Sequence, residues 1–287
     1  MAEGVTRTVV WHNGRLVRAE DVRLSPFDQG LTIGLGAFET LVAAGGEPFA
    51  FSRHWNRLAH SCRGLGLPLP DRTAVADALR AVAAANHHHY GRLRLTVTAG
   101  PGPLGSDHAA EPQPTCLVAS APRPVWPPLA HVILLPWARH HHSPLAGLKS
   151  TSYAENSLAL AEARRRHADE ALLANTSGNL CEGSGSNVFV VRDGRLLTPP
   201  LADGCLAGVT RALVLELARD LGIECAESSL LPAAVSEADE AFLTATTRDS
   251  HPIGRVDDTR LAAAPGPLTR RLQQAWHERF PAPIIDP

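Results

Sequence analysis

Lysine is almost absent from this sequence. Its 287 residues include 26 arginines and a single lysine, Lys149. The formal net charge is only −2 at pH 7, and no stretch concentrates basic residues with interleaved aromatic ones. A nucleic-acid-binding protein normally carries such a stretch, so we expect no nucleic-acid partner. The scarcity of lysine singles out Lys149, because a primary amine can bond covalently to an aldehyde and a guanidinium cannot.

Cysteine and long apolar runs are scarce as well. No apolar stretch approaches the roughly 20 residues needed to cross a bilayer. Glu3 and the β-type run from Thr6 to Trp11 stand where a signal peptide would have a charged and then an apolar segment. The sequence therefore predicts a soluble cytoplasmic protein without a membrane partner. The cysteines are odd in number and lack the paired spacing of a zinc site, so we expect free thiols in a reducing cytosol: Cys62, Cys116, Cys181, Cys205 and Cys225.

Two histidine runs, His87 to His89 and His140 to His142, invite a metal-binding interpretation. Three consecutive side chains cannot converge on one ion from a regular helix or strand, and no Asp or Cys has a recognisable ligand spacing to either run. We therefore predict no metal site. The first run is expected to end a helix, and the second lies shortly before Lys149, where it is placed to line the entrance of a pocket.

A proline-rich segment divides the chain. Residues 121–128 contain four prolines, which exclude a helix or an interior strand there. With 44% hydrophobic residues, the chain is long enough for a large core in one or two domains. We predict a small N-terminal α/β domain over 1–120, a linker over 121–128 and a larger C-terminal α/β domain over 129–287.

Hydrophobic periodicity predicts a mixture of helices and strands in both parts. Asn13-Gly14 and Asp193-Gly194 are typical of the tight turns of hairpins, so we expect one hairpin near the start and another over 188–197. Further strands are predicted over 38–43, 49–51, 92–98, 132–135, 170–174 and 241–246, and helices over 53–64, 73–85, 154–166, 210–221 and 268–280.

Three runs in the second half of the chain carry the groups that a protein needs to handle pyridoxal phosphate. Leu148 to Tyr153 supplies an amine, Cys181 to Phe189 supplies a carboxylate that can face a ring nitrogen, and Leu206 to Arg211 supplies a helix start that can hold a phosphate. Two further runs, Gly36 to Thr40 and Arg53 to Leu58, precede them. A last run, Thr244-Ala245-Thr246-Thr247, follows near the end.

In this order and spacing, these runs resemble the class IV pyridoxal-phosphate enzymes. That family includes the branched-chain and D-amino-acid aminotransferases and aminodeoxychorismate lyase, and the resemblance extends almost end to end. It implies a mixed α/β fold of two domains with the cofactor, pyridoxal 5'-phosphate, between them. It also implies a homodimer that acts on a small-molecule amine.

The resemblance assigns the bond with the cofactor aldehyde to Lys149. Taken alone, a lysine is usually an exposed surface residue. In a chain that uses arginine for every other basic position, however, a purely solubilising charge would be expected to be arginine too. This argument favours a chemical role for Lys149.

The resemblance also assigns the remaining cofactor contacts. Glu182 would keep the pyridine nitrogen protonated; the alternative is a loop carboxylate that caps nearby backbone amides. Val209 and Thr210 would bind the phosphate at a helix start, although Thr210 could equally be a plain helix cap. Arg57 and Thr246 match phosphate contacts of the family, with Arg57 as the charged clamp; by itself, Arg57 would be read as exposed on a helix.

Thr40 and Ala154 bear on the type of reaction. Thr40 matches a threonine near the reactive lysine in the lyase group, where branched-chain aminotransferases have glycine, although in isolation it is an ordinary strand residue. Branched-chain enzymes carry a tyrosine five residues after the lysine, whereas this chain has Ala154 there and Tyr153 one place earlier. We therefore expect aminodeoxychorismate lyase, with Lys149 and Thr40 as catalytic residues. The alternatives are an amino-acid transaminase of the D-amino-acid or branched-chain type and a non-catalytic binding module on the same fold.

Overall fold

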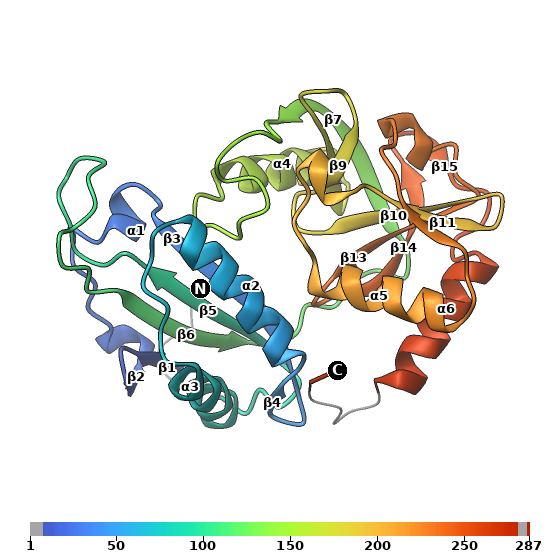
Figure 1. The fold of residues 1–287 in the computed structure, drawn as a ribbon. Helices are drawn as coiled ribbons and strands as arrows, with labels where there is room; N and C mark the ends of the chain where they lie inside the picture. Colours follow the sequence, from blue (N-terminus) through green and yellow to red (C-terminus); the bar gives the residue numbers. More distant parts are fainter. Residues whose placement is uncertain (1–7, 281–285) are drawn as a thin grey trace. The chain divides into compact units, whose positions relative to one another are not determined.

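The computed structural model describes residues 8–280 and 286–287, which divide into two compact units of mixed α and β structure (Figure 1). Within these residues, the first unit comprises the chain up to Pro124, the short segment Leu148–Tyr153 and the final two residues. The second unit comprises Val125–Gly147 and the chain from Ala154 to the end of the last helix. The predicted fold class, mixed α/β, is confirmed, and the structure has two sheets.

The first unit is built on a six-stranded antiparallel sheet with the strand order β2-β1-β6-β5-β3-β4. The predicted first hairpin is present, and its turn residues Asn13 and Gly14 have positive φ angles of 44° and 94°. Thr6, which we assigned to the first strand, lies outside the described residues. The strands are β1 (Val9–His12), β2 (Arg15–Arg18), β3 (Gly36–Ala44), β4 (Glu47–Pro48), β5 (Arg92–Thr98) and β6 (Thr115–Ala121).

Two helices, α2 (Phe51–Gly64) and α3 (Arg72–Ala85), cover one face of this sheet (Figure 1). In β5, Leu93, Leu95 and Val97 are buried, while the intervening side chains are exposed or half-buried. This alternation gives the sheet one apolar face. Leu58 of α2 and Leu79 of α3 pack against it and are fully buried.

The segment Leu148–Tyr153 extends the pairing of β3. The backbone N–H of Phe38 donates to the carbonyl of Lys149 at 2.9 Å, and the N–H of Thr151 donates to the carbonyl of Gly36 at 2.8 Å. Gly36 permits this approach, since a Cβ atom there would lie 2.7 Å from Oγ1 of Thr151. The segment that contains Lys149 is thus held on the sheet of the first unit.

The division into units differs from the predicted one in Leu148–Tyr153 and in the final two residues, 286 and 287, which all group with the first unit. The chain first leaves the first unit at Pro124, inside the predicted linker 121–128. The prediction assigned all of 129–287 to the C-terminal domain, whereas Leu148–Tyr153 groups with the N-terminal unit. The reason is backbone pairing between segments that are far apart in the sequence, which local composition does not reveal.

The second unit contains a nine-stranded mixed sheet. Eight strands follow the order β12-β11-β10-β13-β14-β7-β8-β9, and β15 pairs with β14. Three of the neighbouring pairs, β11 with β12, β14 with β7 and β7 with β8, are parallel. The strands are β7 (Ala130–Arg139), β8 (Glu170–Asn175), β9 (Leu180–Gly183), β10 (Asn187–Arg192), β11 (Arg195–Thr198), β12 (Cys225–Glu227), β13 (Glu240–Ala245), β14 (Asp249–Val256) and β15 (Thr259–Arg260).

Three helices pack on this sheet. Helix α4 (Ala154–Arg165) lies against β7 and β8, whereas α5 (Val209–Asp220) and α6 (Pro267–Arg279) lie against each other and against β13. Phe189 and Phe242 stack between β10 and β13, with ring centroids 5.0 Å apart. The remaining helical segments are α1 (Gln29–Thr32) and the 3-10 turns Ala19–Asp21, Leu201–Asp203 and Pro232–Val235.

One predicted strand is not formed. Residues 49–51 were expected to be a strand, but β4 is confined to Glu47–Pro48, and α2 begins at Phe51 after Ala50, which has φ of 54°. Five strands were not predicted, namely β6, β9, β12, β14 and β15. In β14, Pro252 and Gly254 interrupt the apolar run. The other predicted helices and strands are present to within a few residues at each end.

Among the described residues, none of the helices is both long and apolar enough to span a bilayer. In the same part of the chain, the His, Cys, Asp and Glu side chains nowhere gather in a group of three that could hold a metal ion.

Leu213 and Leu158 offer a matched test of where the core of the second unit lies. Leu213 of α5 is 2% exposed, and Leu158 of α4 is 63% exposed. We expect Leu213→Ala to lower the free energy of unfolding by about 2–5 kcal/mol, because it leaves a cavity. Leu158→Ala should change it by less than about 0.5 kcal/mol. Urea denaturation measures both values, and equal effects would contradict this packing.

Candidate functional site

Lys149 lies against aromatic side chains of the first unit. Its Nζ atom is 4.4 Å from the centroid of the Phe38 ring and 5.7 Å from that of Tyr153, and these two rings meet edge to face. The backbone N–H of Lys149 donates to Oγ of Ser61 at 3.0 Å. Lys149 is therefore held at both its backbone and its amine, and it is half-buried.

Strand β3 carries different groups on its two faces. Because side chains alternate along a strand, Phe38 and Thr40 share one face, and Glu39 lies on the other, which packs on α2. Arg94 of β5 pairs in register with Thr40, and its Cζ atom lies 3.4 Å from the centroid of the Phe38 ring. Arg94 forms no ion pair with a carboxylate in the part of the chain that the structure describes. The Phe38 ring is thus in contact with two cationic side chains, Lys149 and Arg94.

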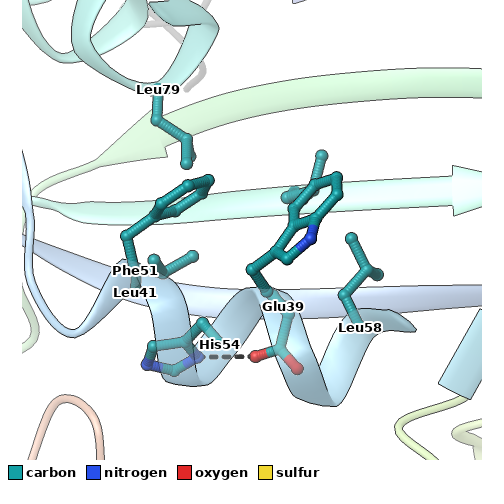
Figure 2. Close-up of a pocket in the computed structure, with 8 residues that line it drawn as sticks. Glu39, Leu41, Phe51, His54, Leu58 and Leu79 are labelled. Carbon is teal, nitrogen blue, oxygen red and sulfur yellow. Dashed lines mark hydrogen bonds and ion pairs between the residues drawn. The ribbon is translucent and has the colours of Figure 1, made fainter. Parts of the chain in front are cut away.

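Arg57 is held by a buried carboxylate. Its Nε and Nη2 atoms donate to Oε1 and Oε2 of Glu39 at 2.8 and 2.7 Å. His54, one turn earlier on α2, bonds through Nδ1 to Oε2 of Glu39 at 2.7 Å, the contact drawn as a dashed line in Figure 2. Glu39 and His54 are 1% and 2% exposed, and the side chain of Arg57 is 9% exposed. Arg57 is therefore not on an exposed helix face, which was the alternative for that residue.

The pKa values in this cluster follow from burial and pairing. Burial by itself would raise the pKa of the Glu39 carboxyl, but the charge and hydrogen bonds of Arg57, with help from His54, lower it from 4.5 to about 2. Burial lowers the pKa of His54, although Glu39 opposes this shift. Glu39 is thus charged and His54 neutral near pH 7, so the Nδ1–H of His54 donates to the carboxylate.

Glu182 lies on β9 in the second unit and is 6% exposed. Oε1 accepts a hydrogen bond from Nη1 of Arg139, and Oε2 accepts one from the backbone N–H of Leu206 at 2.9 Å. Each carboxylate oxygen can accept more than one hydrogen bond. The two hydrogen bonds therefore fix the orientation of the Glu182 carboxylate on both sides.

Helix α5 begins shortly after Leu206, the residue whose backbone N–H donates to Glu182. Gly208 is its N-cap residue, so no side-chain oxygen caps the first backbone N–H groups. Gly208 is required by close contact, because a Cβ atom there would lie 2.0 Å from Oδ1 of Asn187. Nδ2 of Asn187 also donates to the carbonyl of Leu206 at 2.9 Å. Val209 and Thr210 form the first turn of this anchored helix, at its positive end.

Thr246 lies in the turn between β13 and β14 and is half-buried. The predicted site residues therefore form two groups. Lys149, Thr40 and Arg57 belong to the first unit, and Glu182, Val209, Thr210 and Thr246 to the second.

Four contributors to the site were not assigned from the sequence: Glu39, His54, Arg94 and Arg139. Glu39 and His54 lie inside the runs that carry the family resemblance, so their position was a signal that we did not use. Arg94 and Arg139 lie at the surface side of a strand and at a strand end, where a single arginine among 26 gives no signal.

The residues present fit pyridoxal phosphate. The first unit holds the only amine of any side chain against an aromatic ring, and on the other face of the same strand an arginine fixed by a carboxylate. The second unit holds an oriented carboxylate close to a helix start that has glycine at its N-cap. These are an aldehyde-reactive group, a partner for a ring nitrogen and two sites for an anion.

Comparison with known proteins agrees with a site of this kind. The family model Amino-transferase class IV matches residues 36–256. A branched-chain-amino-acid aminotransferase of Pseudomonas aeruginosa is 30% identical, over 94% of this chain and 92% of that protein.

Solved structures of two kinds are similar to the chain. The branched-chain amino acid aminotransferase of T.th., complexed with N-(5'-phosphopyridoxyl)-L-glutamate, matches with a TM-score of 0.87 and 28% identity, over 96% of this chain and 94% of that one. The 4-amino-4-deoxychorismate lyase of Pseudomonas aeruginosa matches with a TM-score of 0.81 and 32% identity, over 94% and 98%.

The lowered pKa of Glu39 predicts a specific dependence of stability on pH. A carboxyl whose pKa is lower in the folded state stabilises the fold above its unfolded pKa, and this contribution disappears as the pH falls. For Glu39, the loss should occur between about pH 4.5 and pH 2 and amount to about 3 kcal/mol at most. Urea denaturation of the protein and of Glu39→Gln over this range should give free energies of unfolding that converge as the pH falls. Parallel curves would contradict the assignment.

Proposed function

Because the chain belongs to the class IV aminotransferase family, an enzyme family that uses pyridoxal phosphate, we propose that it is an amino-acid transaminase that binds this cofactor. The observation that carries the proposal is the position of the sole lysine, held against Phe38 on the sheet of the first unit. This differs from our first expectation, a lyase. Branched-chain aminotransferases prevail among the similar proteins, and they favour transfer of an amino group to a 2-keto acid.

The residues act as follows in this proposal. When bound, the cofactor supplies an aldehyde for the amine and a ring that withdraws electrons from the adjacent carbon. Lys149 would bond to the aldehyde, be released by the substrate amine, and then carry a proton from the substrate carbon that bears nitrogen to the neighbouring carbon of the cofactor, after which water would release the keto acid. Glu182, oriented by Arg139 and Leu206, would accept a hydrogen bond from the ring nitrogen and keep it protonated.

Four residues bind the phosphate in this proposal. Arg57 supplies a full positive charge, and the backbone N–H groups of Val209 and Thr210 supply the positive end of α5. Thr246 adds a hydroxyl from the turn after β13.

Arg94 supports an amino acid as the class of substrate. Its guanidinium lies on the same Phe38 ring as the amine of Lys149 and has no carboxylate partner among the described residues. The carboxylate of an amino-acid substrate would pair with the Arg94 guanidinium while the amino group of the same substrate meets Lys149.

Aminodeoxychorismate lyase remains the second candidate, and Thr40 is the observation that favours it. Thr40 matches the lyase group and shares the face of β3 with Phe38. A solved lyase is 32% identical to this chain. The expectations of a homodimer and of a cytoplasmic location stay predictions of this proposal.

Lys149→Ala and Lys149→Arg test the role of the amine. Both should abolish turnover, because neither side chain can bond to an aldehyde, although arginine keeps the positive charge. Both variants should keep the circular dichroism spectrum of the original protein. The protein itself should show a visible absorbance band with pyridoxal phosphate that shifts when an amine is added. Retained turnover in either variant would contradict the mechanism.

A substrate assay separates the two reactions. We expect amino acids with 2-oxoglutarate to give new keto acids, measured by chromatography. Aminodeoxychorismate should give no pyruvate. Pyruvate and 4-aminobenzoate from aminodeoxychorismate alone would reverse the order of the two candidates.

A further inference from the structure

Glu39 is a charged group in an apolar interior. Figure 2 shows its carboxylate next to His54, within a small cavity otherwise lined by apolar side chains of β3, β5, α2 and α3. These include Leu41, Leu58 and Leu79, which are all less than 2% exposed. A carboxylate in such surroundings is costly unless it is paired and hydrogen-bonded. Its presence therefore calls for an explanation beyond packing.

The contacts of Glu39 fix the plane of one guanidinium. Glu39 accepts from Nε and Nη2 of Arg57 with one oxygen each, and this paired geometry leaves the arginine little freedom to rotate. His54 donates to Oε2 and so restricts the carboxylate itself. These contacts fix the orientation of Arg57, which is more than neutralising the charge of Glu39 would require.

We propose that Glu39, with His54 behind it, is a positioning residue that orients Arg57 toward the phosphate of the cofactor. This inference rests on the proposed function, which makes Arg57 the phosphate clamp. Glu39 itself contacts neither the phosphate nor the reacting atoms. Because β3 also pairs with the backbone of Lys149, the same strand sets the position of the reactive amine and, through Glu39, that of the clamp.

A purely structural role makes a different prediction from a positioning role. If Glu39 only stabilised the first unit, its loss would weaken the binding of any cofactor-like molecule to the same degree. If it orients Arg57, its loss should weaken only ligands that carry a phosphate. Pyridoxal phosphate and pyridoxal differ in that group alone, so the ratio of their dissociation constants isolates the contribution of the phosphate.

The test is to measure both dissociation constants by absorbance titration for the protein and for Glu39→Gln. Glutamine has nearly the same shape but no charge, and its amide nitrogen cannot accept from Arg57. We expect Glu39→Gln to weaken the binding of pyridoxal phosphate by about tenfold or more, the equivalent of one charge-assisted hydrogen bond. Binding of pyridoxal should change less than about twofold.

Glu47→Gln is the matched control. Glu47 pairs with Arg80 of α3 at 2.6 Å in the same unit, but this pair is largely exposed. Its removal should leave the ratio of dissociation constants unchanged. If Glu39→Gln does not fold, Arg57→Lys provides the same test. Lysine still neutralises Glu39 but lacks the paired geometry, so it should also lose the preference for the phosphate.

The outcomes are distinguishable. An unchanged ratio in Glu39→Gln, or equal weakening of both ligands, would overturn the positioning role while leaving the proposed function standing. The same holds for an unchanged ratio in Arg57→Lys where that variant replaces it. If the original protein does not bind pyridoxal phosphate at all, the proposed function fails first and the inference fails with it.

Discussion

The short β pairing between β3 and the segment Leu148–Tyr153 is the interaction on which the arrangement of reactive groups in the first unit depends. It brings a lysine from beyond the proline-rich linker back onto a sheet formed by the N-terminal part of the chain. Backbone hydrogen bonds hold it there, and Gly36 allows the close approach. Because Phe38 and Glu39 are consecutive on β3, one strand presents an aromatic ring to the amine and a carboxylate to Arg57 on its opposite face. Sequence neighbours thus serve two different parts of the proposed site.

The use of arginine for every basic position except one has a consistent physical meaning. Three buried carboxylates pair with arginine: Glu39 with Arg57, Glu182 with Arg139, and Glu170 with Arg248 at 2.9 Å. Arginine suits these positions, because its planar group makes paired hydrogen bonds and stays charged when buried. An amine is needed only where a covalent bond to an aldehyde must form and break. In the proposed function, arginine therefore supplies the structural charges, and Lys149 supplies the one side-chain amine that can react.

Much of the fold could be predicted from periodicity and turn residues, because those signals are local. The Asn13-Gly14 hairpin, the Ala-rich helix α3 and the amphipathic helix α5 all follow from short stretches of sequence. What failed depended on distant partners. Strand β14 contains Pro252 and Gly254, and it is a strand because β13 and β7 lie on either side. The assignment of Leu148–Tyr153 to the first unit has the same origin. In the site, motifs indicated Lys149, Glu182 and Arg57. Glu39 and His54 lie inside the same runs, but the runs do not show that these residues orient Arg57. Arg139 was not indicated by any pattern, since an ion pair between distant residues leaves no local trace.

The residues that remove the first proton do not distinguish a transaminase from a lyase, because both reactions begin with that step. Discrimination must come from groups that contact the substrate further from that carbon, and Thr40 and Arg94 lie opposite each other on the face of β3 and β5 that carries Phe38. A lyase must also deliver a proton to the methylene carbon of the departing enolpyruvyl group, so that this group becomes pyruvate. A threonine hydroxyl and a guanidinium both hold their protons too tightly near neutral pH to do so efficiently, which would leave that second task to Lys149 as well. For a transaminase, this face of β3 and β5 needs only a cationic side chain that binds the carboxylate of the substrate. Arg94, stacked on Phe38 beside the amine, provides one.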